Sequence, residues 1–246
     1  MQTRPTRKLG TAAALTLTGV LALSGVANAT DASTTSSSDP SNDAGHVAFD
    51  AAKTRCLESV DVRLTAIGRY QGNVAAAVNL TSDHRASLDS ILGSAQSGLT
   101  TLRATIEAET DPAALKSECS EVFTGYRIFA LRGPQTRLSI GGDAAAAAAD
   151  KLADVAADLA EDIAEAKAAG KDTSEAEADL ADMQAKIADA EAKLPGLVDT
   201  VLTFTPAQWN ADHTVLSGSI STLRAVRSDL KDAARDARKI TVELAD

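Results

Sequence analysis

Three arginines and a tyrosine carry the clearest binding chemistry of this 246-residue sequence. They are Tyr126, Arg127, Arg132 and Arg137. A guanidinium group can donate two parallel hydrogen bonds to a carboxylate or a phosphate. We therefore predict that these side chains bind an anionic ligand, such as a phosphate of the cell envelope or the carboxylates of a partner protein.

The segment that these residues lie in or directly precede is predicted to be irregular. It runs from 128 to 142 and includes the pairs Gly133-Pro134 and Gly141-Gly142. Because proline lacks a helical hydrogen-bond donor and glycine weakens a helix, a single straight helix is not expected here. Irregular segments of a helical scaffold often carry binding functions. Segment 128–142 is therefore the predicted binding site.

A second basic group recurs every three or four residues near the C-terminus: Arg224, Arg227, Lys231, Arg235 and Arg238. This spacing places its members in one stripe on a helix. We expect the stripe to pair with acidic side chains of its own helix and of segment 144–202. The acidic residues of that segment follow the solvent-facing period and predict a charged surface, with weak Ca²⁺ binding as the alternative.

The sequence lacks the motifs of catalysis and of metal binding. Its histidines, His46, His84 and His213, never occur four residues apart, as a helical zinc site requires. It contains no serine nucleophile elbow and no phosphate-binding glycine loop. We expect His84 and His213 to lie at the surface or near helix caps. We predict that the protein is not an enzyme and takes no metal or cofactor.

Cys56 and Cys119 are the two cysteines of the chain. In an exported protein an even number of cysteines favours a disulfide, and two buried free thiols are the alternative. In the chain-entropy model this cross-link would stabilise the fold by on the order of 4 kcal/mol.

The N-terminus has the pattern of a secretory signal peptide. Basic residues precede the apolar stretch 11–26, and the small residues Ala27-Asn28-Ala29 follow it. The stretch is short for a bilayer span and no second one follows, so we expect a secreted mature protein without an integral membrane segment. Loss of residues 1–29 removes three positive charges and changes the net charge from -10 to -13. Such a charge disfavours nucleic acid as a partner.

The chain is predicted to contain three regions. Residues 1–29 are the signal peptide, residues 30–46 form a disordered tail rich in Ser, Thr and Asp, and residues 47–246 form a single helical-bundle domain. Aromatic residues make up only 3% of the chain, whereas alanine is abundant. The helices are therefore expected to pack closely through small side chains.

Apolar residues recur at helical spacing through most of the predicted domain. Helices are predicted to start at Thr81, at Asp111-Pro112 and at Thr205-Pro206, where a capping side chain precedes the apolar period. The last of these helices is expected to continue to near the C-terminus.

Segment 144–202 is predicted to form a long antiparallel hairpin. Gly170 is placed to end its first helix in the left-handed conformation, and Ser174 with Glu177 predicts the cap of the second. Pro195-Gly196 is expected to kink the second helix without ending it. The predicted fold is all-α, an elongated bundle of about five helices that includes this hairpin.

Two segments, 110–135 and 163–194, resemble a group of secreted helical proteins of actinobacteria. The matching features are a Thr-Asp start at Thr110-Asp111, the aromatic run at Phe123 and Tyr126-Arg127, and the turn Gly170-Lys171-Asp172. The resemblance implies a secreted helical protein and carries over no catalytic or ligand residue.

A second resemblance is to the Spy/CpxP-type periplasmic chaperones, which have an L-T-x-x-Q signature. Here Leu80-Thr81-Ser82-Asp83 is followed by His84 in place of the expected Gln, and Thr205-Pro206-Ala207-Gln208 follows Phe204 in place of Leu. Both stretches are also explained as helix caps.

The function predicted from the sequence is non-catalytic binding or a structural role at or near the cell envelope. The partner would be a protein or an envelope component, and the oligomeric state is left open. The alternative is an extracytoplasmic chaperone that holds unfolded clients. An exposed apolar surface would favour the chaperone.

Overall fold

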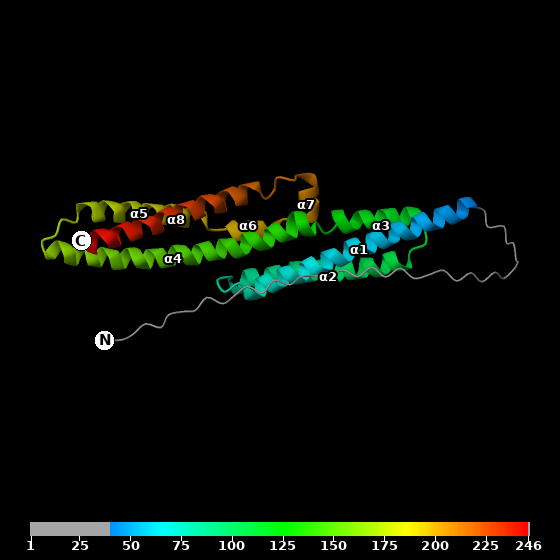
Figure 1. Ribbon diagram of the computed structural model, residues 1–246, viewed down its shortest axis with the longest axis horizontal. Helices are drawn as coiled ribbons and strands as arrows, with labels where there is room; N and C mark the ends of the chain where they lie inside the picture. The colour runs from blue at the N-terminus through cyan, green and yellow to red at the C-terminus, as the bar shows by residue number, and fades with distance from the viewer. Residues whose placement is uncertain (1–39, 246) are drawn as a thin grey trace, which may run out of the picture. The chain divides into compact units, whose positions relative to one another are not determined.

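The computed structural model describes the backbone of residues 40–245 and the side chains of residues 45–245. The expected signal peptide, 1–29, and residues 30–39 of the expected tail lie outside the described residues. Regular structure within 40–245 is helical throughout, which confirms the all-α prediction (Figure 1). The helices are α1 (Pro40–Ala76), α2 (Ser82–Ala108), α3 (Pro112–Thr124), the π-helix η1 (Ile128–Arg132), α4 (Gly133–Ala168), α5 (Ser174–Lys193), α6 (Leu197–Thr203), α7 (Pro206–Ala211) and α8 (Ser217–Ala245).

Helices α1, α2 and α3 pack together as a first group (Figure 1). Their shared core consists of large apolar side chains, including the fully buried Ile67, Leu92 and Leu99. The Cys56–Cys119 disulfide joins α1 to α3, with an S–S distance of 2.16 Å, so the predicted pairing is confirmed. The first group is thus held by both a hydrophobic core and a covalent cross-link.

The C-terminal part of α4 packs with α5 and α8 as a second group (Figure 1). Alanine is frequent in its core, where Ala156, Ala190 and Ala233 are buried beside larger residues such as Met183 and Ile240. Alanine brings helix backbones close together, because no long side chain separates them. The expected close packing through small residues is therefore found here.

Local capping chemistry explains where several helices begin, as predicted. The hydroxyl of Thr81 accepts a hydrogen bond from the backbone N–H of His84. The carboxylate of Asp111 accepts from two backbone N–H groups of α3. Thr205 and Gln208 form a complete capping box at α7. Each cap satisfies donors that the first helical turn leaves unpaired.

The prediction that segment 128–142 is irregular is wrong. The structure is helical through it, because η1 continues directly into α4. Pro134 lies in the first turn of α4, where the missing N–H is not needed. Gly142 lies where α4 approaches α6, and a Cβ atom there would come 2.5 Å from Val198 Cγ2. The glycine therefore permits close packing and does not break the helix.

The prediction of a hairpin over 144–202 places the turn at Gly170 correctly, but both of its end points are wrong. Gly170 has φ of +85° and ends the first arm as expected, but that arm begins at Gly133. The second arm ends at Lys193, and a turn that includes Gly196, with φ of +70°, separates it from α6. Pro195-Gly196 is thus a stop and not a kink.

Three further helix boundaries differ from the prediction. The cap of α5 is Thr173 rather than Ser174. The last long helix begins at Ser217, because Asp212 Oδ1 accepts hydrogen bonds from Thr214 and forms a turn after α7. Residues 40–46 of the expected tail belong to α1. No helix in 40–245 is both long enough and apolar enough to cross a membrane.

Candidate functional site

Arg127 holds α7 against the end of α3. It has φ of +47°, in the left-handed region that most residues avoid, at the junction of α3 and η1. Its guanidinium lies 4.7 Å from the centre of the Trp209 ring, and its Nε donates a hydrogen bond to Asn210 Oδ1. Asn210 in turn donates to the carbonyl of Thr124. Arg127 therefore has protein partners that account for its position.

The side chains of Tyr126 and Arg132 also contact other parts of the protein. Tyr126 packs on α2, where its hydroxyl lies against Gly98, and burial together with the charge of Glu121 raises the pKa of Tyr126. Arg132 Nη1 donates to Gln135 Oε1 at 2.9 Å and to the carbonyl of Phe204 at 3.3 Å. Burial lowers the pKa of the Arg132 guanidinium.

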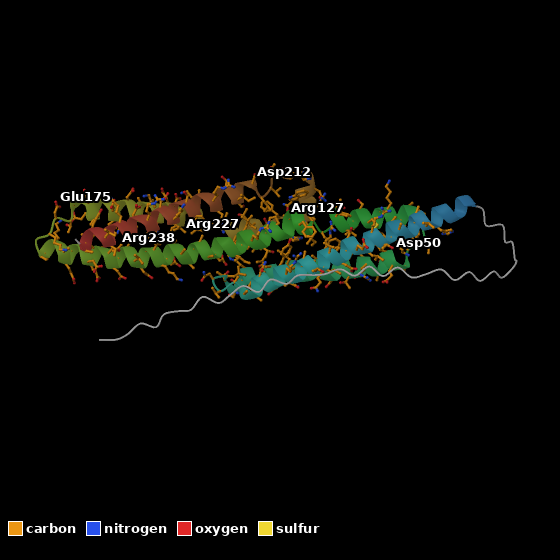
Figure 2. All side chains as sticks on the ribbon, viewed as in Figure 1. Asp50, Arg127, Glu175, Asp212, Arg227 and Arg238 are labelled. Carbon is orange, nitrogen blue, oxygen red and sulfur yellow. A yellow bond between two sulfur atoms is a disulfide. The ribbon has the colours of Figure 1, made fainter. Side chains whose placement is uncertain are left out.

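Arg137 lies apart from the other two arginines, and its exposed side chain lines an open cavity of about 750 Å³ between α1, α4 and α8. Its neighbour there is Arg227 of α8. The predicted grouping of Arg127, Arg132 and Arg137 at one ligand is therefore not what the structure brings together. Arg137 instead lines a cavity together with Arg227, a member of the C-terminal basic stripe; Figure 2 shows Arg127 and Arg227 at separate places.

The walls of this cavity are mostly apolar. The side chains of α1 and the turn after it contribute Asn73, Ala76 and Ala77, whereas α4 and α8 contribute larger apolar groups such as Leu138 and Leu223. Asn73, Arg137 and Arg227 are its polar side chains, and no carboxylate lines it. The cavity can therefore accept an apolar group and a negative charge together.

Arg227 reaches this cavity because α4 has a glycine opposite it. A Cβ atom on Gly141 would overlap Arg227 Nη2 and lie 3.1 Å from Leu223 Cδ2. A larger residue at this position would require the flexible end of the Arg227 side chain to shift.

The expected ion pairs between the basic stripe and the acidic side chains of segment 144–202 are not found among the described residues. Lysines of α5 bind acids of α8 instead, as in Lys186–Asp236 and Lys193–Asp229, both at 2.7 Å. Within the stripe, Arg235 pairs with Asp232 of its own helix. Among the side chains of 45–245, Arg137 and Arg227 make no ion pair with a carboxylate.

A second polar cluster was not predicted as a site. His84 Nδ1 lies 2.9 Å from both carboxylate oxygens of Asp143, and its Nε2 lies 3.2 Å from Asp199 Oδ1. The backbone N–H of Thr81 also donates to Asp143, whose side chain is 7% exposed. This cluster links α2, α4 and α6.

The charge state of His84 follows from these neighbours. Burial of the ring opposes its protonation, but the hydrogen bonds and charges of Asp143 and Asp199 outweigh burial and raise the pKa of His84. Sequence position correctly suggested a histidine near a cap, since His84 lies in the first turn of α2. Its carboxylate partners are 59 and 115 residues away, and no local signal could reveal them.

A smaller cavity of about 390 Å³ adjoins His84 and includes Asp150 and Glu191. In the part of the chain that the structure describes, no set of three His, Cys, Asp or Glu side chains is arranged to hold a metal ion. We assign no ligand to this acidic cavity.

The geometry thus defines an all-α protein with a disulfide and a cavity that contains two arginines. In comparisons with known proteins, no family model, no curated protein and no solved structure matches the chain. The resemblances to secreted actinobacterial proteins and to Spy/CpxP-type chaperones stay predictions.

Proposed function

We propose that this protein is an exported, non-catalytic binding protein that acts at or near the cell envelope. The observation that carries the proposal is the cavity between α1, α4 and α8, whose volume lies within the range of about 300 to 1,000 Å³ typical of ligand sites. Arg137 and Arg227 give it a positive charge in a chain whose net charge is -10.

Two further features support the proposal, one concerning export and the other the non-catalytic role. The Cys56–Cys119 disulfide suits an oxidising compartment outside the cytoplasm. His84 and His213 have partners consistent with structural roles, because His84 binds two carboxylates and His213 stacks on Trp209. Neither histidine is placed beside a nucleophile in the way that acyl-transfer catalysis requires.

The proposal is tested by sedimenting the exported protein with isolated cell envelopes at low and at moderate salt. We expect the protein to pellet with the envelopes, and we expect pelleting to weaken as salt screens the two arginines. The double variant Arg137→Ala, Arg227→Ala should pellet less than wild type.

The matched control is Arg224→Ala, Arg238→Ala, which removes the same charge from exposed positions outside the cavity. Figure 2 shows Arg227 and Arg238 at separate places along α8. Equal loss of pelleting in both double variants would mean that net charge alone is responsible. Protein that stays in the supernatant at both salt concentrations would refute a role at the envelope.

A second candidate function, holding unfolded exported clients, is favoured by a different surface. An open groove of about 610 Å³ lies between α1 and α3 beside the disulfide, and Phe49, Leu115 and Phe123 line it. Phe123 is 45% exposed. If this groove holds clients, the protein should suppress aggregation of a reduced, unfolding substrate protein, and Phe123→Ser should weaken that suppression. An unchanged aggregation rate would exclude this second function.

A further inference from the structure

The α1/α4/α8 cavity contains one arginine from each of two helices, Arg137 of α4 and Arg227 of α8. Arg137 and Gly141 are separated by four residues and so lie on the same face of α4, about 6 Å apart along the helix axis. The guanidinium of Arg227 covers Gly141. The two positive groups therefore approach one place in the cavity from two helices.

Among the described side chains of 45–245, no carboxylate forms an ion pair with either of these charges. Neither guanidinium donates a hydrogen bond to a described side chain or backbone group, and no carboxylate lines the cavity. The acidic residues closest in sequence are engaged elsewhere, as Asp229 binds Lys193 of α5. Two like charges repel each other, so an anion that bridges them would relieve the repulsion and gain charge-assisted hydrogen bonds.

The remainder of the cavity selects for an apolar body. Leu138 and Ile140 of α4 and Ile220 and Leu223 of α8 contribute most of its larger apolar side chains. Ile220 is 40% exposed, so a bound chain would cover apolar surface that now faces solvent. A small inorganic anion would leave this surface uncovered.

We propose that the ligand of this cavity is a single-chain amphipathic anion, a free acyl chain that ends in a carboxylate. Its carboxylate would bridge Arg137 and Arg227, and its chain would lie along the apolar walls of α4 and α8. This inference rests on the proposed binding function and adds the chemical class of the ligand. An anionic lipid that remains within a bilayer presents related chemistry and is the competing source.

Gly141 offers a test that leaves the charge of the protein unchanged. In Gly141→Ala the added methyl would overlap Arg227 Nη2, so the flexible end of the Arg227 side chain would have to shift from its present position. Gly68→Ala is the matched control, because Gly68 is also inside a long helix and a Cβ atom there would meet no atom within 4 Å. Both changes favour the helix equally.

The experiment is titration calorimetry of the exported protein with sodium laurate, kept below its micelle concentration. The control ligand is dodecanol, which has the same chain without the charge. We expect saturable binding of laurate, at least about tenfold weaker binding in Arg137→Ala and in Arg227→Ala, and weaker binding in Gly141→Ala than in Gly68→Ala. Circular dichroism and a thermal melt establish that each variant is folded.

Each alternative result is decisive. No binding of laurate, or equal binding of laurate and dodecanol, would overturn the inference. Binding only to vesicles that contain phosphatidylglycerol would also overturn it and would identify a bilayer surface as the ligand. If envelopes pellet the wild-type protein while laurate does not bind, the proposed function stands and the ligand class is wrong. If laurate binds while envelopes do not pellet the protein, the role at the envelope is wrong.

Discussion

Gln135 lies where η1, α4 and α6 meet, and its replacement by leucine is the most direct test of how these elements are held. The residue is fully buried. Its Nε2 donates hydrogen bonds to the carbonyls of Val201 and Phe204, both at 2.8 Å, and its Oε1 accepts one from Arg132. The two carbonyls lie at the C-terminal end of α6, where that of Val201 also accepts a long bond of 3.4 Å from the backbone N–H of Phe204.

The expected cost follows from these three bonds. A neutral hydrogen bond contributes about 1 kcal/mol to stability, and one with a charged donor about twice as much. Leucine fills a similar volume but pairs with none of the three groups, so the carbonyl of Val201 loses its side-chain donor. Phe204 keeps a longer bond from Arg132. We expect Gln135→Leu to lower the free energy of unfolding by about 3 kcal/mol.

The assay is urea unfolding followed by circular dichroism at the helical minimum, with the disulfide intact. The control is Gln71→Leu, because Gln71 also bonds a second helix, through Gln96 Oε1 at 3.0 Å, but does so at the solvent-exposed surface. That variant should stay within about 0.5 kcal/mol of wild type. If Gln135→Leu and Gln71→Leu have equal stability, the buried bonds do not hold α6 and the reasoning fails.

Three further perturbations test the stability of the fold. For His84→Gln, the loss of unfolding free energy should be larger at pH 5.5 than at pH 8.5. A raised pKa in the folded state means that protonated His84 stabilises the fold below the ordinary pKa of about 6.5, and this contribution disappears as pH rises through the raised pKa. Equal losses at the two pH values in urea unfolding would contradict it. Replacing Cys56 and Cys119 together by alanine should lower the free energy of unfolding by about 4 kcal/mol in the same assay, since the cross-link spans a sequence separation of 63. A decrease below about 1 kcal/mol would show that the disulfide does not restrict the unfolded chain. Gly142→Ala should lower the melting temperature, because the overpacking cost of about 1 to 3 kcal/mol exceeds the gain in helix stability from replacing glycine by alanine. Gly68→Ala, where the added methyl meets no atom, should raise the melting temperature. Equal shifts in the two variants would exclude a clash at Gly142.

The sequence predicted those features of the fold that depend on neighbouring residues. Thr81, Asp111 and Thr205 cap helices with donors two or three residues away, so the pattern that specifies each cap is contained in a few positions. Gly170 ends a helix for an equally local reason. The all-α fold follows from the apolar period, which is also a local property.

The candidate site depended on contacts between distant residues, and local reasoning placed it only in part. Arg132 and Arg137 are five residues apart, so on a helix they point about 140° away from each other. One therefore enters the core beside α6 while the other lines the cavity. Arg227 lines the same cavity as Arg137, and this requires α8 to cross α4 at Gly141. Nothing in the segment 128–142 alone indicates that crossing.

The order of the helices along the chain determines when each group can fold during synthesis. The first group consists of consecutive elements, so its core can form once α3 has emerged, and its disulfide can form when these helices reach an oxidising compartment. The second group must wait for α8, the last helix, to cover apolar residues of α5 such as Met183 and Ile187. Domains generally fold as their chains emerge, so the α4–α5 hairpin is the segment that stays uncovered longest. Its many carboxylates repel other chains during this interval and oppose aggregation until α8 arrives.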